Sequence, residues 1–470
     1  MRMLIGGTWI EGDRQIEVLN PFDDSVIDTV PSASPEQVEE AIRSAERGFE
    51  VMRKMPAHQR SAILNRTAEL LTEHTEALGR LLAQEVGKTL NEGCTEAGRA
   101  AETFTLAAEE AKRIHGETVP YDAAAHGTNK MGFFIRVPIG IVCAITPFNF
   151  PLNLAAHKVG PAIAAGCAII LKPASATPLA DLRMGELLLE AGLPPEAINI
   201  VTGSGETVGE QLVANKRIRK VSFTGSADVG KRIMKTAGLK KCTMELGSNS
   251  AVVIMDDADL SAAADRIRVG GYAVAGQVCI STQRVLIHEA VFDDMMGELL
   301  PRVRGLRAGD QLDETTDVGP MITRDIAAET EGNIREAVDG GARLLCGGER
   351  DGAVVQPAVL LDVPRESFLG GSEAFAPLIC VNRFSDIDEA IRLVNDSPYG
   401  LQAGIYTQNI NNAFSFIKEA EVGGVMVNEV PTFRVDGMPY GGVKDSGLGR
   451  EGPRFAIEDM TEIRVVAFSL

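Results

Sequence analysis

The sequence carries no excess of positive charge, no long apolar run and no closely spaced pair of cysteines. Of its 470 residues, 46 are Lys or Arg and 65 are Asp or Glu, which gives a formal net charge of −19. Binding to a nucleic acid backbone depends on excess positive charge, so the composition argues against a nucleic acid partner. With 45% hydrophobic and 24% charged residues, the chain is typical of a folded globular protein and not of a disordered one.

Apolar runs in this chain are short. None approaches the roughly 18 residues that a membrane-spanning helix needs, and one of the clearest, Ile139–Ile145, ends at Thr146 and Pro147. The first residues, 1–11, contain no apolar stretch long enough for a signal peptide. We therefore expect a cytoplasmic protein that has no membrane partner.

The cysteines are scattered and odd in number, so the sequence contains no C-x-x-C metal or redox motif. A dispersed, odd set is typical of reduced thiols, and we expect no metal site. The seven cysteines stand at positions 94, 143, 167, 242, 279, 346 and 380.

The N-terminal third predicts helices. Ser34 and Pro35 begin a segment in which Gln37 has the capping-box position and apolar residues recur at helical spacing. Stretches rich in Ala, Leu and Glu continue this pattern from 58 to 115, and the composition predicts breaks near Gly87 and Gly93.

From residue 139 the pattern changes to short apolar runs that alternate with amphipathic helical stretches, and the alternation resumes after residue 244. Runs without polar alternation are buried on both faces, which indicates parallel sheets covered by helices, in two α/β domains. Two further strand-like segments, 128–136 and 461–468, lie outside the alternation and are able to pair as an arm. The runs are 139–145, 167–171, 198–201 and 221–223, followed by 250–255, 283–287 and 379–384.

Doubly wound sheets bind ligands at the carboxyl ends of their strands, where this chain has a glycine-bearing turn at 225–231. The turn nearly matches the phosphate-binding pattern G-x-x-x-x-G-K-[ST], but Arg232 replaces the hydroxyl residue that would hold Mg²⁺. A helix N-terminus of this kind still suits a pyrophosphate through its N–H groups and dipole. We interpret the turn as part of a dinucleotide site and not as a nucleotide hydrolase.

Cys279 and Glu245 form a candidate catalytic pair. A single Cys is usually a small buried hydrophobe, and a carboxylate at a strand end is often an ordinary surface charge. Cys279, however, follows a glycine at 276 and precedes a strand, and Glu245 stands just before a glycine turn. Together, a thiol and a carboxylate base can perform covalent carbonyl chemistry without a metal ion or a His.

The motifs around these residues resemble those of the aldehyde dehydrogenase superfamily over essentially the whole chain. The matches are PFNFP at 147–151, KPASATP at 172–178, FTGS at 223–226 with Gly230, ELG at 245–247, GQVC at 276–279, EAFAP at 373–377 and PYGG at 439–442. The resemblance implies an α/β protein with the aldehyde dehydrogenase-like fold, namely two doubly wound α/β domains and a small β oligomerisation arm.

The same resemblance implies domain boundaries and an assembly. The dinucleotide-binding domain would comprise residues 1–120 and 139–245, the catalytic domain 246–435, and the oligomerisation arm 121–138 and 456–470. The arm strand at 461–468 would be an exposed edge unless another chain covers it. A homodimer or homotetramer is therefore expected.

The resemblance also assigns catalytic roles. Cys279 is the nucleophile, and its own N–H with the side-chain amide of Asn149 holds the oxyanion of the bound aldehyde. Glu245 is the general base that activates water to hydrolyse the thioester, and Glu451 is a candidate for a proton relay.

The implied cofactor is NAD or NADP. Many NAD-preferring relatives have Glu where this chain has Ser175, and the loss of that carboxylate removes a repulsion of the 2′-phosphate, so NADP⁺ should be tolerated. The implied cofactor-binding residues are Thr146, Pro147, Phe148, Lys172, Ser175, Gly225, Ser226, Gly230, Glu373 and Phe375.

The substrate candidates are Arg99, Asn153, His157 and Arg434. Where many relatives place a Trp in the substrate tunnel, this chain has His157, which favours hydroxylated or anionic aldehydes over alkyl ones. The alternatives are a structural His on a buried helix and arginines that are exposed or ion-paired. Val278 argues against relatives that act on phosphonoacetaldehyde or glyceraldehyde 3-phosphate, which often carry Arg directly before the catalytic Cys.

The predicted function is NAD(P)⁺-dependent oxidation of a short polar aldehyde, with a 2-hydroxyaldehyde such as lactaldehyde favoured. Three alternatives remain open. The first is a CoA-acylating semialdehyde dehydrogenase, against which the presence of Glu245 argues. The second is a dehydrogenase of an anionic aldehyde such as sulfolactaldehyde, succinic semialdehyde or glyceraldehyde 3-phosphate. The third is a non-catalytic protein on the same fold.

Overall fold

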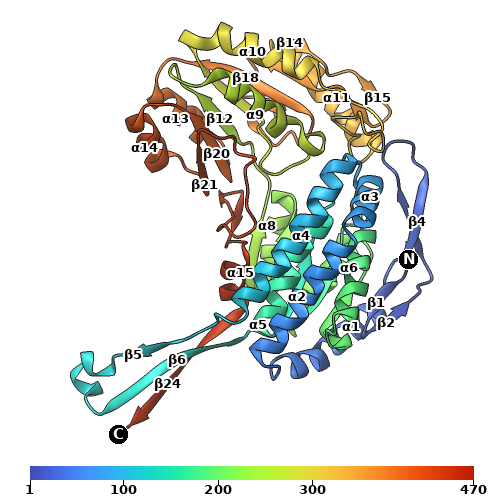
Figure 1. Cartoon of the computed structure of the whole chain (residues 1–470), viewed down its shortest axis with the longest axis vertical. Helices are drawn as coiled ribbons and strands as arrows, with labels where there is room; N and C mark the ends of the chain where they lie inside the picture. The colour runs from blue at the N-terminus through green and yellow to red at the C-terminus, as the bar shows by residue number, and fades with distance from the viewer.

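The computed structural model describes residues 1–470, which form two α/β lobes and a projecting arm (Figure 1). The first lobe is built on an eight-stranded sheet with the order β2-β1-β9-β8-β7-β10-β11-β23, and the second on a seven-stranded sheet with the order β14-β17-β18-β13-β12-β20-β21. No helix combines the length and the apolar character that crossing a membrane requires.

The five central strands of the first sheet run parallel. They are β7 (Ile141–Ile145), β8 (Ala168–Lys172), β9 (Ile198–Ile200), β10 (Ile218–Thr224) and β11 (Lys241–Glu245). Every residue of β7 and β8 is buried, which confirms the prediction made from their continuous apolar sequences. The outer strands are antiparallel to their neighbours: β1 (Met3–Ile5) and the edge strands β2 (Thr8–Ile10) and β23 (Gly447–Leu448).

Helices cover both faces of this sheet, as predicted for a doubly wound fold. Successive side chains of a strand point to opposite faces, so Val142 packs with α2 to α6 while Ile141 packs with α1, α7 and α8. The helices are α1 (Pro35–Met52), α2 (Ala57–Glu73), α3 (Thr75–Val86), α4 (Leu90–Glu110), α5 (Pro151–Ala165), α6 (Leu179–Glu190), α7 (Glu210–Ala214) and α8 (Ala227–Ala237).

The start of α1 confirms the predicted capping box. Ser34 Oγ accepts a hydrogen bond from Gln37 N, and Gln37 Oε1 accepts one from Ser34 N at 2.9 Å. These bonds satisfy two N–H groups at the helix start.

Gly93 is not a helix break, contrary to the prediction. As predicted, α3 ends at Val86, and Gly87 follows it in the left-handed conformation with φ 86°, but Gly93 lies inside α4. A Cβ on Gly93 would lie 2.2 Å from the carbonyl oxygen of Gly79 in α3. The glycine is needed because two helices approach closely, and not because a helix ends.

In the second sheet all strands are parallel except β14. The strands are β12 (Ala251–Ile254), β13 (Arg284–His288), β14 (Arg343–Cys346), β17 (Ala358–Leu361), β18 (Leu378–Phe384), β20 (Gln402–Tyr406) and β21 (Gly424–Val427). The apolar runs at 250–255, 283–287 and 379–384 thus correctly predict β12, β13 and β18.

Helices also cover both faces of the second sheet. One apolar core contains α9 (Leu260–Tyr272), α10 (Phe292–Arg304) and α11 (Arg324–Asp339), and the other contains α13 (Ile387–Asn395) and α14 (Ile410–Glu419). Outside the arm, the other strands form the pairs β3 (Gln15–Leu19) with β4 (Val26–Pro31), β15 (Arg350–Asp351) with β16 (Val354–Val355) and β19 (Tyr399–Gly400) with β22 (Val443–Lys444). The other α-helices are the short α12 (Phe368–Gly371) and α15 (Pro453–Asp459).

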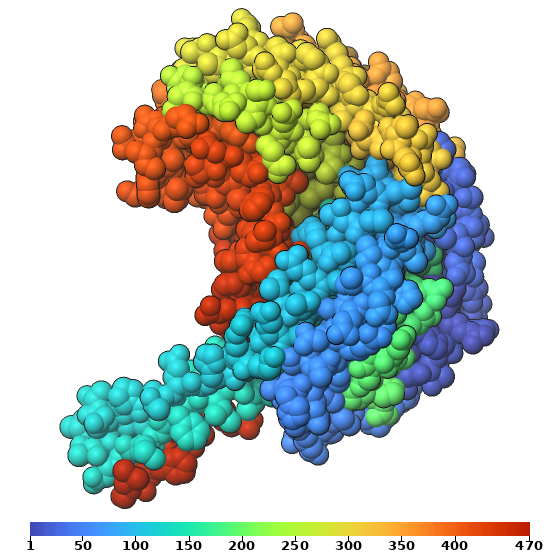
Figure 2. All heavy atoms as spheres, viewed as in Figure 1, coloured from blue at the N-terminus to red at the C-terminus, as the bar shows by residue number.

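The arm is a three-stranded antiparallel sheet of β5 (Glu117–Val119), β6 (Lys130–Pro138) and β24 (Thr461–Ser469). β24 pairs with β6 along its whole length, which confirms the predicted pairing. Figure 2 shows the arm projecting from the body of the molecule. On the edge strand β24, Ile463 and Val465 are 55% and 59% exposed. The arm's role in assembly and the domain boundaries stay predictions.

Alanine substitutions at Gly93 and Gly98 test the packing of α4. A Cβ at Gly93 meets a backbone oxygen, whereas one at Gly98 has no atom within 4 Å. We expect Gly93→Ala to lower the free energy of unfolding by about 1–3 kcal/mol, and Gly98→Ala to raise it by up to about 1 kcal/mol through helix propensity. Urea midpoints measure both changes. A Gly93→Ala protein as stable as Gly98→Ala would contradict the close packing.

Candidate functional site

A cavity of about 790 Å³ lies where the carboxyl ends of the first sheet's parallel strands face the second lobe. This is the edge at which doubly wound sheets bind ligands. The structure brings six of the predicted catalytic and substrate residues to its lining: Arg99, Asn149, Asn153, Glu245, Cys279 and Arg434. His157 and Glu451 are not among the lining residues.

Cys279 reaches the cavity on a strained turn between α9 and β13. Val274 and Ala275 have φ values of 51° and 53°, in the left-handed region that residues other than glycine rarely adopt. Gly276 follows with φ 68°, and a Cβ there would lie 1.9 Å from a carbonyl oxygen of the neighbouring loop. The Glu92 carboxylate accepts a hydrogen bond from Val274 N at 2.7 Å and stabilises the turn.

The Cys279 thiol has one hydrogen-bond partner, the hydroxyl of Tyr440, with 2.9 Å between Sγ and Oη. Burial raises the pKa of the thiol to about 11, although the Tyr440 hydrogen bond and the Arg434 charge act to lower it. Tyr440 lines the cavity, and sequence reasoning missed it. The PYGG motif marked its position but gave its hydroxyl no role.

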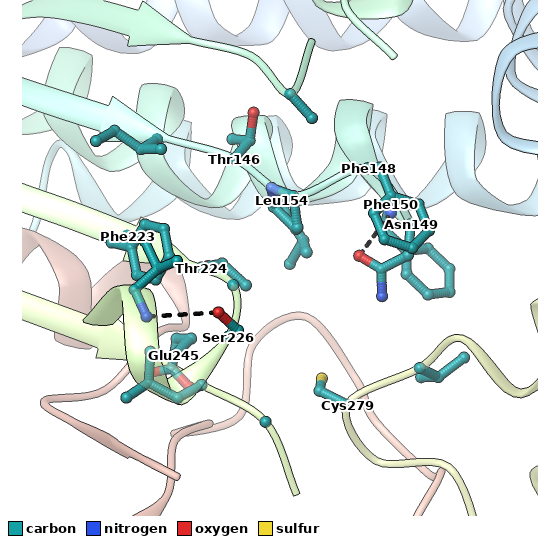
Figure 3. Close-up of a pocket in the computed structure, with 18 of the residues that line it drawn as sticks. Thr146, Phe148, Asn149, Phe150, Leu154, Phe223, Thr224, Ser226, Glu245 and Cys279 are labelled. Atoms are coloured by element: carbon teal, nitrogen blue, oxygen red, sulfur yellow. Dashed lines mark hydrogen bonds between the residues drawn. The ribbon is translucent and has the colours of Figure 1, made fainter. Parts of the chain in front are cut away.

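Asn149 faces Cys279 across the cavity, with its amide nitrogen directed toward the thiol (Figure 3). Asn149 Nδ2 donates one hydrogen bond to the Gln277 carbonyl oxygen at 2.8 Å, and Lys88 Nζ holds the Asn149 backbone oxygen at 2.7 Å. The second amide hydrogen remains unused, and the Cys279 N–H donates to no acceptor in the protein. Two free donors beside a thiol are the arrangement that stabilises an oxyanion.

Glu245 lies at the end of β11, on the other side of the cavity from Asn149 (Figure 3). Its side chain is buried, and neither carboxyl oxygen has a hydrogen-bond partner. Burial and the charge of Glu451 raise its pKa well above the ordinary range. A Cβ on Gly441 would lie 2.9 Å from Glu245 Oε1, so this glycine leaves space for the carboxyl group. Glu245 is therefore not a surface charge but a buried carboxyl group without a protein partner at the lining of the cavity.

Glu451 lies in a buried ionic network. It accepts hydrogen bonds from Lys158 Nζ at 2.6 Å and from Arg434 Nη2 at 3.1 Å, and Lys158 also donates to Thr224 Oγ1 at 2.7 Å. Burial opposes ionisation of Glu451, but the charges of Lys158 and Arg434 outweigh it and hold the pKa at about 2. Glu451 is thus an anion whose charge acts on Glu245.

Asp436 is the centre of a second polar group, which we call the Asp436 cluster: Arg99, Asn153, His157 and Asp436. Its Oδ1 accepts from Asn153 Nδ2 at 3.1 Å and contacts His157 Nε2 at 2.8 Å. Arg99 binds it through two bonds, Nε to Oδ2 at 3.0 Å and Nη2 to Oδ1 at 2.7 Å. Sequence reasoning missed Asp436, because it stands 337 residues from Arg99 and no spacing rule joins them.

His157 is fully buried on α5 and contacts the cavity-lining Arg434, whose Nη2 lies 3.0 Å from His157 Nε2. Burial and the Arg434 charge lower the pKa of the imidazole, which favours the neutral ring. Because a carboxylate only accepts, the contact with Asp436 requires the proton on Nε2, and Nδ1 then has no partner. That His157 contacts substrate stays a prediction.

The cavity continues along residues that suit a dinucleotide. Lys172 is buried, its Nζ donates only to the Pro173 carbonyl oxygen at 2.8 Å, and burial lowers its pKa to about 8. The other N–H groups of this ammonium group are able to donate to an acceptor such as a ribose hydroxyl. Ser175 Oγ donates to the Gly203 carbonyl oxygen at 3.0 Å. Ser175 is not among the residues that line the cavity, whereas Lys172 is. The other predicted cofactor residues that line this end are Thr146, Pro147, Phe148, Gly225 and Ser226.

The N-terminus of α8 borders this part of the cavity. Ser226 is its N-cap, and its side chain accepts from Val229 N. Gly230 lies inside the helix, where a Cβ would lie 2.5 Å from a methyl carbon of Leu246, so it is required by helix packing and does not line the cavity. A glycine-bearing helix start of this kind suits a pyrophosphate.

Glu373 and Phe375 lie between the dinucleotide end and Cys279. Glu373 Oε1 accepts from Ser248 N at 2.9 Å, and burial raises its pKa to about 7. Phe375 has φ 48°, and its ring meets that of Phe148 edge to face with centroids 5.8 Å apart. No group of three or more His, Cys, Asp or Glu side chains is arranged to hold a metal ion.

Comparison with known proteins identifies relatives of the whole chain. The family model described as "Aldehyde dehydrogenase family" matches residues 9–466, which confirms the resemblance seen in the motifs. The 3-sulfolactaldehyde dehydrogenase of Priestia aryabhattai is 42% identical over 468 residues, covering 100% of this chain and 98% of that protein. The lactaldehyde dehydrogenase of Methanococcus aeolicus is 39% identical over 468 residues, covering 99% of each.

A solved structure supports the fold and the cofactor class. The glyceraldehyde-3-phosphate dehydrogenase of Methanocaldococcus jannaschii, complexed with NADP, superposes with a TM-score of 0.94 at 40% identity. The match covers 97% of this chain and 100% of that one.

Replacing Asp436 with Asn tests whether the Asp436 cluster stabilises the fold. Although burial opposes its ionisation, bonds from His157 and Arg99 depress the Asp436 pKa. We expect Asp436→Asn to lower the free energy of unfolding at pH 7 by about 1.5–3 kcal/mol, because hydrogen bonds to a charged group are lost. A depressed pKa means that this contribution is complete above about pH 4 and is lost as the pH falls further.

Asp445→Asn is the matched control for this prediction. Asp445 forms an exposed ion pair with Lys231, and such pairs contribute about 0–1 kcal/mol. Urea unfolding of the wild type and both variants at pH 7 and at about pH 3, below the ordinary Asp pKa, makes the measurement. Equal destabilisation by the two substitutions would show that the Asp436 cluster does not hold the fold.

Proposed function

Since the chain belongs to the aldehyde dehydrogenase family and is an oxidoreductase that uses NAD or NADP, we propose that it oxidises a short 2-hydroxyaldehyde, such as lactaldehyde, to the free carboxylic acid. The observation that carries this proposal is the polar wall beside Cys279. Arg99 and Arg434 line the cavity there, and each is paired with a carboxylate, Arg99 with Asp436 and Arg434 with Glu451.

A charge-compensated wall with free donors suits a hydroxyl group. Arg434 lines the cavity, and its Nε donates to no protein atom, so this N–H has a hydrogen bond to offer to a substrate oxygen that reaches it. Because both arginines already have a carboxylate partner, the wall offers hydrogen bonds without demanding a full negative charge. An alkyl aldehyde would leave the Arg434 donor unpaired, which disfavours it.

Cys279, as the thiolate, attacks the aldehyde carbon. The carbonyl oxygen becomes an alkoxide, which the second Asn149 amide hydrogen and the Cys279 N–H stabilise. When bound, NAD(P)⁺ supplies the hydride acceptor. Oxidation of the thiohemiacetal leaves an acyl thioester on Cys279.

Glu245 acts next as the general base. It takes a proton from a water molecule that attacks the thioester carbon, the Cys279 thiolate leaves, and the acid forms. The buried carboxyl group without a protein partner supports this role, because no protein donor occupies the oxygens that would take the proton from water. Glu451 and Lys158 form the proposed proton relay, and the effect of the Glu451 charge on the Glu245 pKa supports their coupling. A built-in base disfavours acyl transfer to CoA.

The cofactor would be held along the lining from Lys172 to Glu373. Lys172 and Glu373 offer hydrogen bonds to the two ribose rings, and the start of α8 with Ser226 offers N–H groups to the pyrophosphate. Ser175, with no carboxylate to repel a 2′-phosphate, supports use of NADP⁺ as well as NAD⁺. His157 would act on the substrate through Arg434, which it contacts.

An anionic aldehyde is the second candidate. The Arg99 side chain is 27% exposed while it lines the cavity, so it is able to meet a distal anionic group. The relative named 3-sulfolactaldehyde dehydrogenase supports this candidate, since a sulfonate is an anion on a 2-hydroxyaldehyde. We also propose that the arm joins copies of this chain into a homodimer or homotetramer, which the exposed apolar residues of β24 support.

A panel of aldehydes tests the substrate. Purified protein should form NADH and NADPH fastest with lactaldehyde or glycolaldehyde, and at least about 10-fold more slowly with propanal, because a site built around polar donors rejects an analogue that lacks the hydroxyl. Sulfolactaldehyde, succinic semialdehyde and glyceraldehyde 3-phosphate are the comparisons. Activity confined to these anions would replace the first candidate with the second, and strict dependence on CoA would exclude hydrolysis.

Glu245→Gln tests the hydrolytic step. After one turnover with lactaldehyde, the variant should carry a lactoyl adduct on Cys279 that intact mass spectrometry detects. Burial, with the Glu451 charge, raises the Glu245 pKa, so the base form is lost as the pH falls through that raised value. The amount of acyl adduct on the wild-type protein should therefore increase as the pH is lowered. Cys279→Ala is the control and should remain unmodified. A Gln variant that turns over at the wild-type rate would remove Glu245 from the mechanism.

A further inference from the structure

The Tyr440 hydroxyl has only one protein partner, and that partner is the Cys279 sulfur at 2.9 Å. Both groups belong to the lining of the cavity. A hydroxyl at this distance donates its hydrogen when the sulfur is a thiolate, because a thiolate has no hydrogen of its own and only accepts.

The position of Tyr440 does not depend on the thiol. Its backbone pairs with Glu451, from Tyr440 N to Glu451 O at 3.2 Å and from Glu451 N to Tyr440 O at 2.7 Å. The guanidinium of Arg434 lies over its ring, 3.8 Å from the centroid. The hydroxyl is therefore fixed beside the sulfur in advance, without a further loss of side-chain freedom when the thiol ionises.

The surroundings of the thiol otherwise oppose ionisation. Burial raises the pKa of Cys279, the carboxyl groups of Glu245 and Glu373 act in the same direction, and only Tyr440 and Arg434 lower it. Burial also raises the pKa of the Tyr440 phenol well above 10. The phenol therefore keeps its hydrogen over the working pH range and remains a donor.

We propose that Tyr440 is a further catalytic residue, whose hydroxyl donates a hydrogen bond to the Cys279 thiolate and so maintains the nucleophile in its reactive form. This proposal rests on the proposed role of Cys279 as the nucleophile. The thiol proton leaves through the cavity to solvent, and the Sγ–carbon bond then uses the electron pair that the hydroxyl had stabilised. After attack the sulfur is neutral, so the Tyr440 hydrogen is free for an oxygen of the bound substrate.

Tyr440→Phe removes the donor and keeps the aromatic ring under Arg434. The loss of a hydrogen bond to a charged group should raise the thiol pKa by about one to two pH units. A higher thiol pKa leaves less thiolate and so lowers the reaction rate. The greater nucleophilicity of a more basic thiolate offsets part of that decrease. The rate at which Cys279 attacks the disulfide probe 4,4′-dithiodipyridine at pH 7.5 should therefore fall by about 3- to 12-fold.

A second variant makes the test graded. In protein with 3-fluorotyrosine at position 440, the phenol is a stronger donor of nearly the same size, so the same rate should exceed that of the wild type. Tyr406→Phe is the matched control. It also removes a buried tyrosine hydroxyl, but that hydroxyl has no protein partner and lies in the second lobe. Its rate should equal the wild-type rate. Cys279→Ser gives the background from the other cysteines.

Two outcomes would overturn the proposal. One is a Tyr440→Phe rate within about twofold of the wild type, and the other is a 3-fluorotyrosine rate at or below the wild type. If the Phe variant fails to fold, the comparison of the 3-fluorotyrosine protein with the wild type still decides the question. The probe reaction contains neither aldehyde nor cofactor, so its outcome is independent of the substrate assignment. Loss of dehydrogenase activity across the aldehyde panel, with the Tyr440 effect intact, would refute only the proposed function.

Discussion

Burial of charge beside the cavity is the constraint on which the centre of this molecule depends. An ion that leaves water loses several kcal/mol of hydration free energy, and only a well-placed opposite charge compensates for that loss. Lys158 meets Glu451, and Arg99 meets Asp436, so helices α4 and α5 of the first lobe are tied to the chain that returns from the second. Glu245 is the exception, a buried carboxyl group that has no partner in the protein. The contrast separates the paired groups that build the site from the one carboxyl group whose hydrogen-bonding capacity the protein leaves unused.

Much of this arrangement could be predicted from the sequence, because the features concerned are local. The strand β7 could be predicted because a strand buried on both faces needs a continuous apolar run. Asn149, Glu245 and Cys279 could be brought to one cavity because short motifs mark the strand ends and turns that carry them. The pairing of β6 with β24 followed from two apolar segments that had no place in the helix–strand alternation.

The features that the sequence did not predict depend on partners far apart in the chain. Asp436 binds Arg99 from 337 residues away, so no periodicity connects them. Gly93 suggested a helix break because a sequence shows that a glycine is present and does not show that another helix approaches it. His157 could be assigned to a helix, but whether it faces the cavity or another side chain depends on the packing of Arg434, which only the structure shows.

The Asp436 cluster has a consequence for how such a site changes during evolution. Its members come from α4, α5 and the segment that follows β21, and each takes part of its hydrogen bonding from the same carboxylate. A single replacement would leave an unmatched charge or an unmatched donor among the others, so stepwise drift at one position is selected against. Substitutions at these positions should therefore occur together, because each one changes what the shared carboxylate has to satisfy.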